Sequence, residues 1–127
     1  MPEPQLYEYA IIRVVPRVER EEFVNVGVVL FCKSNDILIC KTAFQEDRIR
    51  CIFPEADIAT IRMHLAAFEQ TATGQGAIGS IAALETAARF RWLTAVRSTI
   101  IQCSRVHPGL TYHPENEVNN LLTSFVF

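Results

Sequence analysis

The sequence has no apolar run of the ~18 to 20 residues that a membrane-spanning helix needs. Its first residues, 1–4, lack both a basic flank and an apolar signal-peptide core, so we expect a cytoplasmic protein. It also has no internal repeat, low-complexity tract or interdomain linker, and 50% of its 127 residues are apolar, which argues against wholesale disorder. Because a chain of this length buries one core but is too short for two, we expect a single domain over residues 1–127.

Cysteine is sparse and scattered. The four cysteines stand singly along the chain, at Cys32, Cys40, Cys51 and Cys103. They have neither a CxxC pair nor the Cys/His spacing of a zinc site, so we expect reduced structural thiols, no metal and no cofactor. Cys32 and Cys40 bracket a turn, but a loop of two to four residues places one of residues 37–39 opposite Cys32. A disulfide across that hairpin is therefore not expected.

Lysine is scarce, because ten of the twelve basic residues are Arg and only two are Lys. The formal net charge of −2 gives no overall attraction to phosphate backbones or acidic membranes. This argues against a general nucleic-acid binder. Arg is the better side chain for two-point contacts with carboxylate or phosphate, although Arg richness is also a common result of GC-rich genomes.

Residue patterns predict strands at 6–15, 24–32, 37–43 and 98–106, with a turn at 34–36 joining the second and third. The second strand has few polar residues, so both of its faces should be at least partly covered. Helices are expected from Pro54 to about Gln70, after a cap at Ser80, and from Pro114, each with an apolar stripe. Residues 45–53 are ambiguous and could form one helical turn.

The resulting order, β-β-β-α-α-β-α, indicates an α+β fold. Such an order fits a mostly antiparallel sheet of about four strands with three helices packed on one face.

Residues 74–79 spell GxGxxG directly before an expected helix. In a dinucleotide-binding turn these glycines let backbone amides approach a pyrophosphate. Here the preceding element is a helix, no βαβ unit surrounds the motif, and no acidic residue ends a second strand. We therefore interpret it as a flexible connection between two helices.

Polar residues interrupt the first two expected strands at Arg13, Asn25 and Gly27, and Glu22 directly precedes the second. Strand alternation puts Asn25 and Gly27 on one face, where something should pack over the glycine. If these strands are neighbours, Arg13 comes close to Asn25 or Glu22. Two interpretations stay open: a partly buried ion pair of Arg13 with Glu22, with Asn25 tying down a loop, or an anion site floored by Gly27.

A second polar group follows the second expected helix. Arg97, Ser98 and Thr99 offer a guanidinium, two hydroxyls and backbone amides, which can hold phosphate or carboxylate. Arg91, close by in the helix, is a further candidate ligand-binding residue. Arg97 can equally bind the carbonyl groups at the end of its own helix.

The sequence resembles the bacterial family called domain of unknown function 3037. The resemblance rests on YAIIRVVP (9–16), EFVNVGVVLF (22–31), FRWL (90–93) followed by RST (97–99), and VH (106–107) with the later PE (114–115). It spans almost the whole chain and leaves out residues 49–79, which contain the GxGxxG motif. It implies a small single-domain bacterial protein without an assigned activity or catalytic residue. Some relatives are associated with neighbouring HipA-like kinases, which suits an accessory role.

Three functions remain open. The favoured one is a non-enzymatic accessory or binding module, in which folding brings together two groups, Arg13/Asn25/Gly27 and Arg91/Arg97/Ser98, to bind an anionic small molecule or the acidic segment of a partner. Residues 121–127 would then be an apolar surface for a partner or homodimer. The second is a small enzyme acting on a phosphorylated or nucleic-acid substrate, in which Arg91 and Arg97 stabilise charge and His107 or Glu22 moves a proton. The third is a purely structural interaction protein in which every Arg is satisfied internally.

Overall fold

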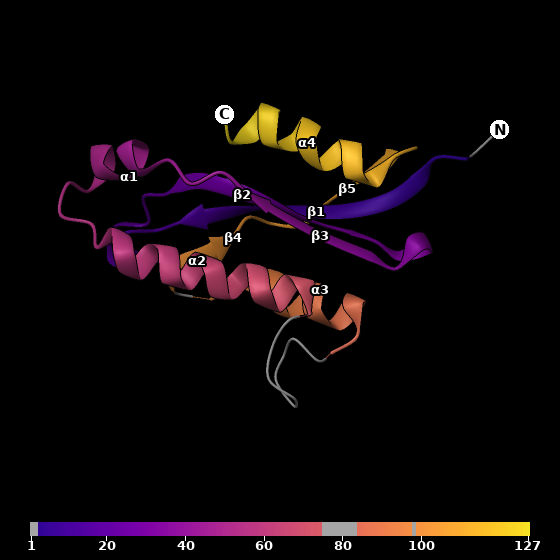
Figure 1. Ribbon diagram of the computed structural model, residues 1–127, viewed down its shortest axis with the longest axis horizontal. Coiled ribbons are helices and arrows are strands. Elements are labelled where there is room, and N and C mark those ends of the chain that lie inside the picture. The colour runs from indigo at the N-terminus through magenta and orange to yellow at the C-terminus, as the bar shows by residue number, and fades with distance from the viewer. Residues whose placement is uncertain (1–2, 75–83, 98) are drawn as a thin grey trace.

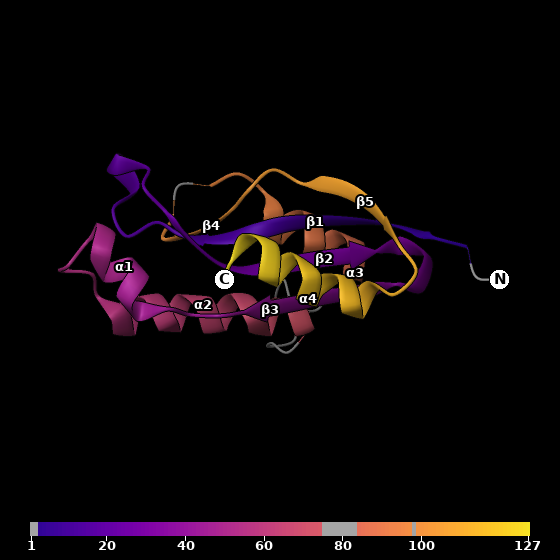
Figure 2. The same ribbon diagram turned by 90° about the horizontal axis from the view of Figure 1, so that it is seen from above.

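The computed structural model describes residues 3–74, 84–97 and 99–127, and an antiparallel sheet forms its centre. The strands are β1 (Gln5–Val14), β2 (Val24–Cys32), β3 (Ile37–Thr42), β4 (Ile101–Cys103) and β5 (His107–Thr111). They lie in the order β3-β2-β1-β4, and β5 also pairs with β1. Figure 2 shows β4 and β5 following one another along the same edge of β1. The predicted α+β class with a mostly antiparallel sheet is confirmed.

Helices cover both faces of this sheet. They are α1 (Glu46–Ile52), α2 (Ile58–Thr73), α3 (Thr86–Thr94) and α4 (Pro114–Phe125). Figure 1 shows α2 and α3 on one side of the strands and α4 on the other. The prediction placed three helices on one face of the sheet, whereas the structure has α4 on the opposite face. The apolar composition of β2 already indicated that both faces of the sheet are covered, because a strand that is buried on both faces needs packing partners on both sides.

Two separate clusters of buried side chains result. The cluster on the α2/α3 face draws on Ala10, Ile12, Val14, Val29, Phe31, Ile61, Leu65, Phe90 and Leu93. The cluster on the α4 face contains Tyr7, Ile11, Val28, Leu30, Cys32, Val118, Leu121, Leu122 and Val126. Successive residues of β1, and of β2 from Val28 onwards, alternate between the clusters, as the pleat of a strand requires. No described helix is long and apolar enough to cross a bilayer.

Several boundaries differ from the prediction. Helix α2 begins at Ile58 rather than Pro54, because the Asp57 side chain caps it by accepting a hydrogen bond from the Thr60 amide. The ambiguous segment 45–53 forms α1. The expected cap at Ser80 and most of the GxGxxG motif lie outside the described residues. Gly74, its first glycine, ends α2 in the left-handed conformation with φ 79°.

The fourth predicted strand, 98–106, is shorter than expected, since only Ile101–Cys103 form β4. At Ser104 the ladder to β1 continues through a side chain, since the Ile11 amide donates to Ser104 Oγ at 2.8 Å. The Ser104 amide in turn donates to the Ile11 carbonyl at 2.8 Å. The chain then resumes as β5, which was predicted to be a turn because of Pro108 and Gly109. Proline is tolerated there because β5 is an edge strand whose only described partner is β1.

The β2–β3 hairpin has the longest of the three predicted loops, which places Ile37 opposite Cys32. Cys40 lies opposite Val29, and all four cysteines are free thiols. The prediction that no disulfide closes this hairpin is confirmed.

Candidate functional site

The α2/α3 face contains an open cleft of about 480 Å³ where α2, the end of α3 and the start of β4 meet. Most of its wall is apolar, and one guanidinium, that of Arg97, faces it. The lining residues are Val18, His64, Ala67, Phe68, Thr71, Trp92, Arg97, Thr99, Ile100 and Ile101. An apolar hollow with a few polar groups is the usual form of a small-molecule site.

Arg97 is held in place by Trp92. Its guanidinium carbon lies 4.1 Å from the centre of the Trp92 ring, and one Nη donates to the Trp92 carbonyl. The cation–π contact is worth ~0.5 to 1 kcal/mol at a partly exposed position. The predicted alternative, that Arg97 binds a carbonyl at the end of its own helix, is therefore confirmed. This bond uses one of five N–H donors and leaves the remainder of the guanidinium available in the cleft.

Helix α2 lines the cleft with His64 and Thr71, which the sequence analysis did not assign to a site, and with Phe68, which belongs to the apolar stripe expected for this helix. Its core stripe includes Ile61 and Leu65, whereas His64, Phe68 and Thr71 follow one another on the adjacent side at helical spacing. In the sequence, the signal for this cleft was a partly apolar row of residues next to the core-facing row of the same helix.

Arg13 lies on the other face of the sheet. It lines a separate cavity of about 200 Å³ with Val15, Val18, Glu21, Phe23 and Gln102. Its guanidinium carbon lies 4.0 Å from the centre of the Phe23 ring, while its Nε is buried without a hydrogen-bond acceptor in the described part of the chain. An unsatisfied buried donor of this kind costs ~1 to 3 kcal/mol.

The structure thus separates Arg13 from Arg97. Each lines its own cavity, one on either side of β4, and Val18 is the only residue that both cavities share. Both positive charges lower the pKa of the Cys103 thiol in β4, but burial has the larger effect and raises that pKa to about 12. Burial likewise raises the pKa of Cys40 to about 12. A single site containing both guanidinium groups is not formed.

Asn25 pairs with Arg13 in the register, as predicted, but it does not share a face with Gly27. A β-bulge at Val26 breaks the alternation, because Ile12 pairs with Gly27 and Arg13 pairs with Asn25. Val26 therefore joins the α2/α3 core. Asn25 points to the opposite face, where its Nδ2 donates to the Phe125 carbonyl at 3.0 Å and its Oδ1 is buried without a partner among the described residues.

Gly27 is needed for the sheet itself. A Cβ added there would lie 2.6 Å from the Lys41 carbonyl oxygen and 3.0 Å from the Thr42 side chain. The prediction that something packs over Gly27 is confirmed, and the neighbour is β3. This leaves no room for an anion above the glycine.

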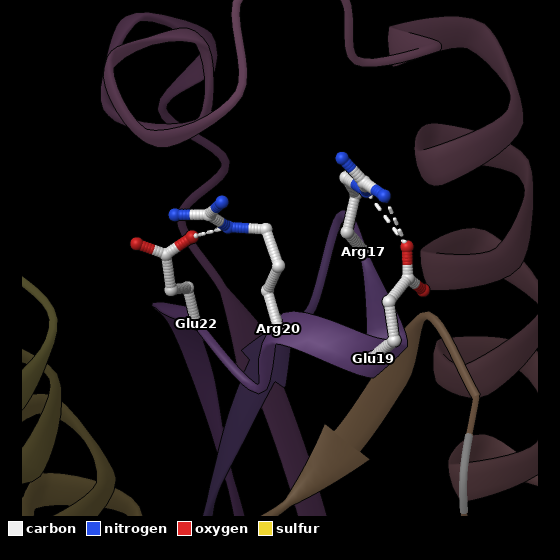
Figure 3. A network of polar contacts seen from close by, with 4 residues as sticks. All are labelled: Arg17, Glu19, Arg20 and Glu22. Atoms are coloured by element: carbon white, nitrogen blue, oxygen red, sulfur yellow. Dashed lines mark hydrogen bonds and ion pairs between the residues drawn. The ribbon is translucent and has the colours of Figure 1, made fainter.

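Glu22 and His107 do not reach either guanidinium cavity. Glu22 pairs with Arg20 at 2.5 Å in the exposed connection between β1 and β2, so its predicted ion pair with Arg13 is not formed. The same connection holds a second exposed pair, Arg17 with Glu19, and Figure 3 shows both. His107 is exposed at the start of β5, with its ring 5.6 Å from that of Tyr9.

The remaining candidates are distributed as follows. Arg91 is exposed on α3 and is absent from the lining of the cleft. Ser98 lies outside the described residues. Within the apolar segment 121–127, Leu121, Leu122 and Val126 are buried in the cluster on the α4 face, whereas Phe125 and Phe127 are 46% and 63% exposed. Across the described ranges, no three His, Cys, Asp or Glu side chains gather as a metal site would require.

The comparisons with known proteins agree with the resemblance in the sequence. A family model described as "Protein of unknown function (DUF3037)" matches residues 9–126, nearly the whole chain. The predicted family is confirmed. No curated protein and no solved structure matches the chain.

Proposed function

The chain belongs to the DUF3037 family, and we propose that it is a binding module that holds an anionic ligand with an apolar body in the Arg97 cleft. The observation that carries this proposal is a guanidinium, oriented by Trp92, at an otherwise apolar hollow of about 480 Å³. A carboxylate or phosphate would bind the free N–H groups of Arg97. The body of the ligand would pack against Phe68, Ile100 and Ile101.

A binding role fits this cleft better than catalysis does. Glu22 and His107, the predicted proton carriers, lie elsewhere, and Arg91 does not line the cleft as a second charge. Besides Arg97, the described lining contains one further ionisable side chain, that of His64. The same anionic chemistry can come from a small molecule or from an acidic side chain of a partner protein, and the experiment has one arm for each.

The test measures binding of naphthalene-2-carboxylate by calorimetry, with naphthalene-2-carboxamide as the neutral counterpart. We expect the acid to bind more tightly than the amide, and Arg97→Gln to weaken the acid by about tenfold or more, which corresponds to ~1.4 kcal/mol. Arg91→Gln removes the same charge from α3 outside the cleft and is the matched control. The partner arm uses a short peptide with one glutamate beside one phenylalanine.

Tighter binding of the naphthoate assigns the site to small molecules, and tighter binding of the peptide assigns it to a partner segment. Equal binding of acid and amide, or equal losses in Arg97→Gln and Arg91→Gln, would contradict the proposal.

A further inference from the structure

We propose that the Arg13 cavity is a second binding site, for a small molecule carrying an ammonium and a carboxylate group together, as a free α-amino acid does. It lies on the opposite face of β4 from the Arg97 cleft and does not depend on the function proposed for that cleft. Its volume of about 200 Å³ suits a ligand of that size.

The argument starts from the charges that face this cavity. Arg13 and Glu21 both line it, yet they form no ion pair with each other or with any other described residue. The two neighbouring acidic residues behave differently, since Glu19 pairs with Arg17 and Glu22 pairs with Arg20 (Figure 3). Among the acidic residues of the β1–β2 connection, Glu21 is therefore the one whose charge faces the cavity.

The second step concerns Arg13. Its stacking on Phe23 fixes the guanidinium, and its buried Nε has no acceptor in the ranges that the structure describes. Because the buried Nε is closed to a ligand, a carboxylate in the cavity would bind the guanidinium at two points through its outer Nη groups. Neither nearby carboxylate neutralises Arg13, because Glu21 lines the cavity without pairing with it and Glu22 is engaged by Arg20.

The third step is the pairing of opposite charges. A simple anion would be repelled by Glu21 and a simple cation by Arg13, whereas a ligand with both charges satisfies each side chain. Gln102 adds an amide to the lining, and its Nε2 already donates to the Thr99 carbonyl at 2.8 Å. Val15, Val18 and Phe23 form the apolar part of the wall, against which an aliphatic or aromatic side chain would lie.

The experiment screens the common L-α-amino acids at millimolar concentration by chemical-shift changes in the ¹⁵N-labelled protein. The tightest ligand is then compared with two analogues, one lacking the amino group and one lacking the carboxylate. For L-leucine these are 4-methylpentanoate and 3-methylbutylamine. We expect both analogues to bind at least about tenfold more weakly than the amino acid, because each leaves one charge of the site unmatched.

Two exposed acidic residues give a matched pair of variants. Glu21→Gln should remove the preference for the amino acid over its carboxylate analogue, because the repulsion of a simple anion disappears. Glu22→Gln, a neighbouring substitution of the same kind, should keep that preference. Arg13→Lys retains the charge but loses the two-point contact, and we expect it to weaken the amino acid by about tenfold. Arg97→Gln should leave amino-acid binding unchanged, so the two proposed sites are tested independently of one another.

Three results would overturn the proposal. They are the absence of binding by every amino acid in the screen, equal affinity of the amino acid and its carboxylate analogue for the wild-type protein, and equal effects of Glu21→Gln and Glu22→Gln.

Discussion

On the α4 face, each of the three longest strands sends one polar side chain to the covering helix. Tyr7 of β1 donates to Glu117 at 3.0 Å, Asn25 of β2 to the Phe125 carbonyl at 3.0 Å, and Lys41 of β3 to Asn119 at 2.9 Å. On the α2/α3 face, the described polar contacts between strands and helices are fewer. They join Thr42 to Glu69 and the Cys103 thiol to the Leu93 carbonyl. That face is held mainly by apolar packing.

The difference helps to explain where the Arg97 cleft lies. A single helix with one apolar stripe can rotate or slide, and ties from three strands fix its position against the sheet. Two helices cover the opposite face, and the seam between α2 and the end of α3 is where the Arg97 cleft opens. We therefore expect the α4 face to be the rigid support and the α2/α3 face to adjust to a ligand.

The largest effect is expected from Gly27→Ala, which acts on the sheet that both faces share. The added Cβ would meet the Lys41 carbonyl, a backbone atom that moves only if β2 and β3 separate. We expect a loss of about 3 kcal/mol in the free energy of unfolding, measured by urea denaturation.

Gly109→Ala is the control for that substitution. Its Cβ would meet the Tyr7 ring at 2.5 Å, a side chain that can move at the expense of its bond to Glu117. We expect a smaller loss in the free energy of unfolding. In hydrogen exchange, only the amides of α4 should lose protection. Similar losses in the two alanine variants would contradict the expectation that a clash with a backbone atom costs more stability than a clash with a side chain.

The sequence predicted the sheet better than it predicted the sites. Period-two alternation and turn residues defined β2 and the hairpin to β3, because both depend on neighbours close in the chain. The bulge at Val26 was not predictable in this way, and it moved Asn25 to the other face from Gly27. Asn25 and Gly27 were recognised as unusual, and both turned out to serve the sheet and α4.

The grouping of the arginines failed for a related reason. Arg13 and Arg97 approach β4 closely enough for both to affect the Cys103 thiol, but strand pleating places them on opposite sides. A contact between residues 13 and 97 requires both side chains to point to the same face of the sheet. A single bulge or a single loop conformation can reverse the face to which a side chain points. The stripe of His64, Phe68 and Thr71 was readable in the sequence, but nothing there showed that α3 would leave it partly uncovered.

The second prediction tests the ties on the α4 face through pH. Burial, followed by the hydrogen bond to Glu117, raises the pKa of Tyr7 from 10.0 to about 12. The protonated phenol is thus favoured in the folded protein, so its contribution is complete below pH 10 and is lost as the pH rises towards 12. We expect the free energy of unfolding to fall over this interval.

Tyr7→Phe is the matched variant for the alkaline titration. It removes the hydroxyl and keeps the ring against Gly109, so we expect a loss of ~1 kcal/mol at neutral pH. It should also give a flatter decline between pH 10 and 12 than the wild-type protein shows. A decline of the same steepness in both proteins would assign the effect to other groups.

The smallest effect, and the most direct comparison of the two faces, is the reactivity of their thiols. Cys40 and Cys103 belong to the α2/α3 face, Cys32 is fully buried on the α4 face, and Cys51 is exposed. Because burial raises the pKa of Cys40 and Cys103 to about 12, their reactive thiolate is suppressed at pH 8 until the face opens. Iodoacetamide should therefore modify Cys51 first, as followed by mass spectrometry of peptides. In dilute urea, Cys40 and Cys103 should react before Cys32, because a face with fewer polar contacts to its helices opens at lower free energy. If Cys32 reacts together with them, the two faces open as one unit, and the rigid support assigned to the α4 face does not exist.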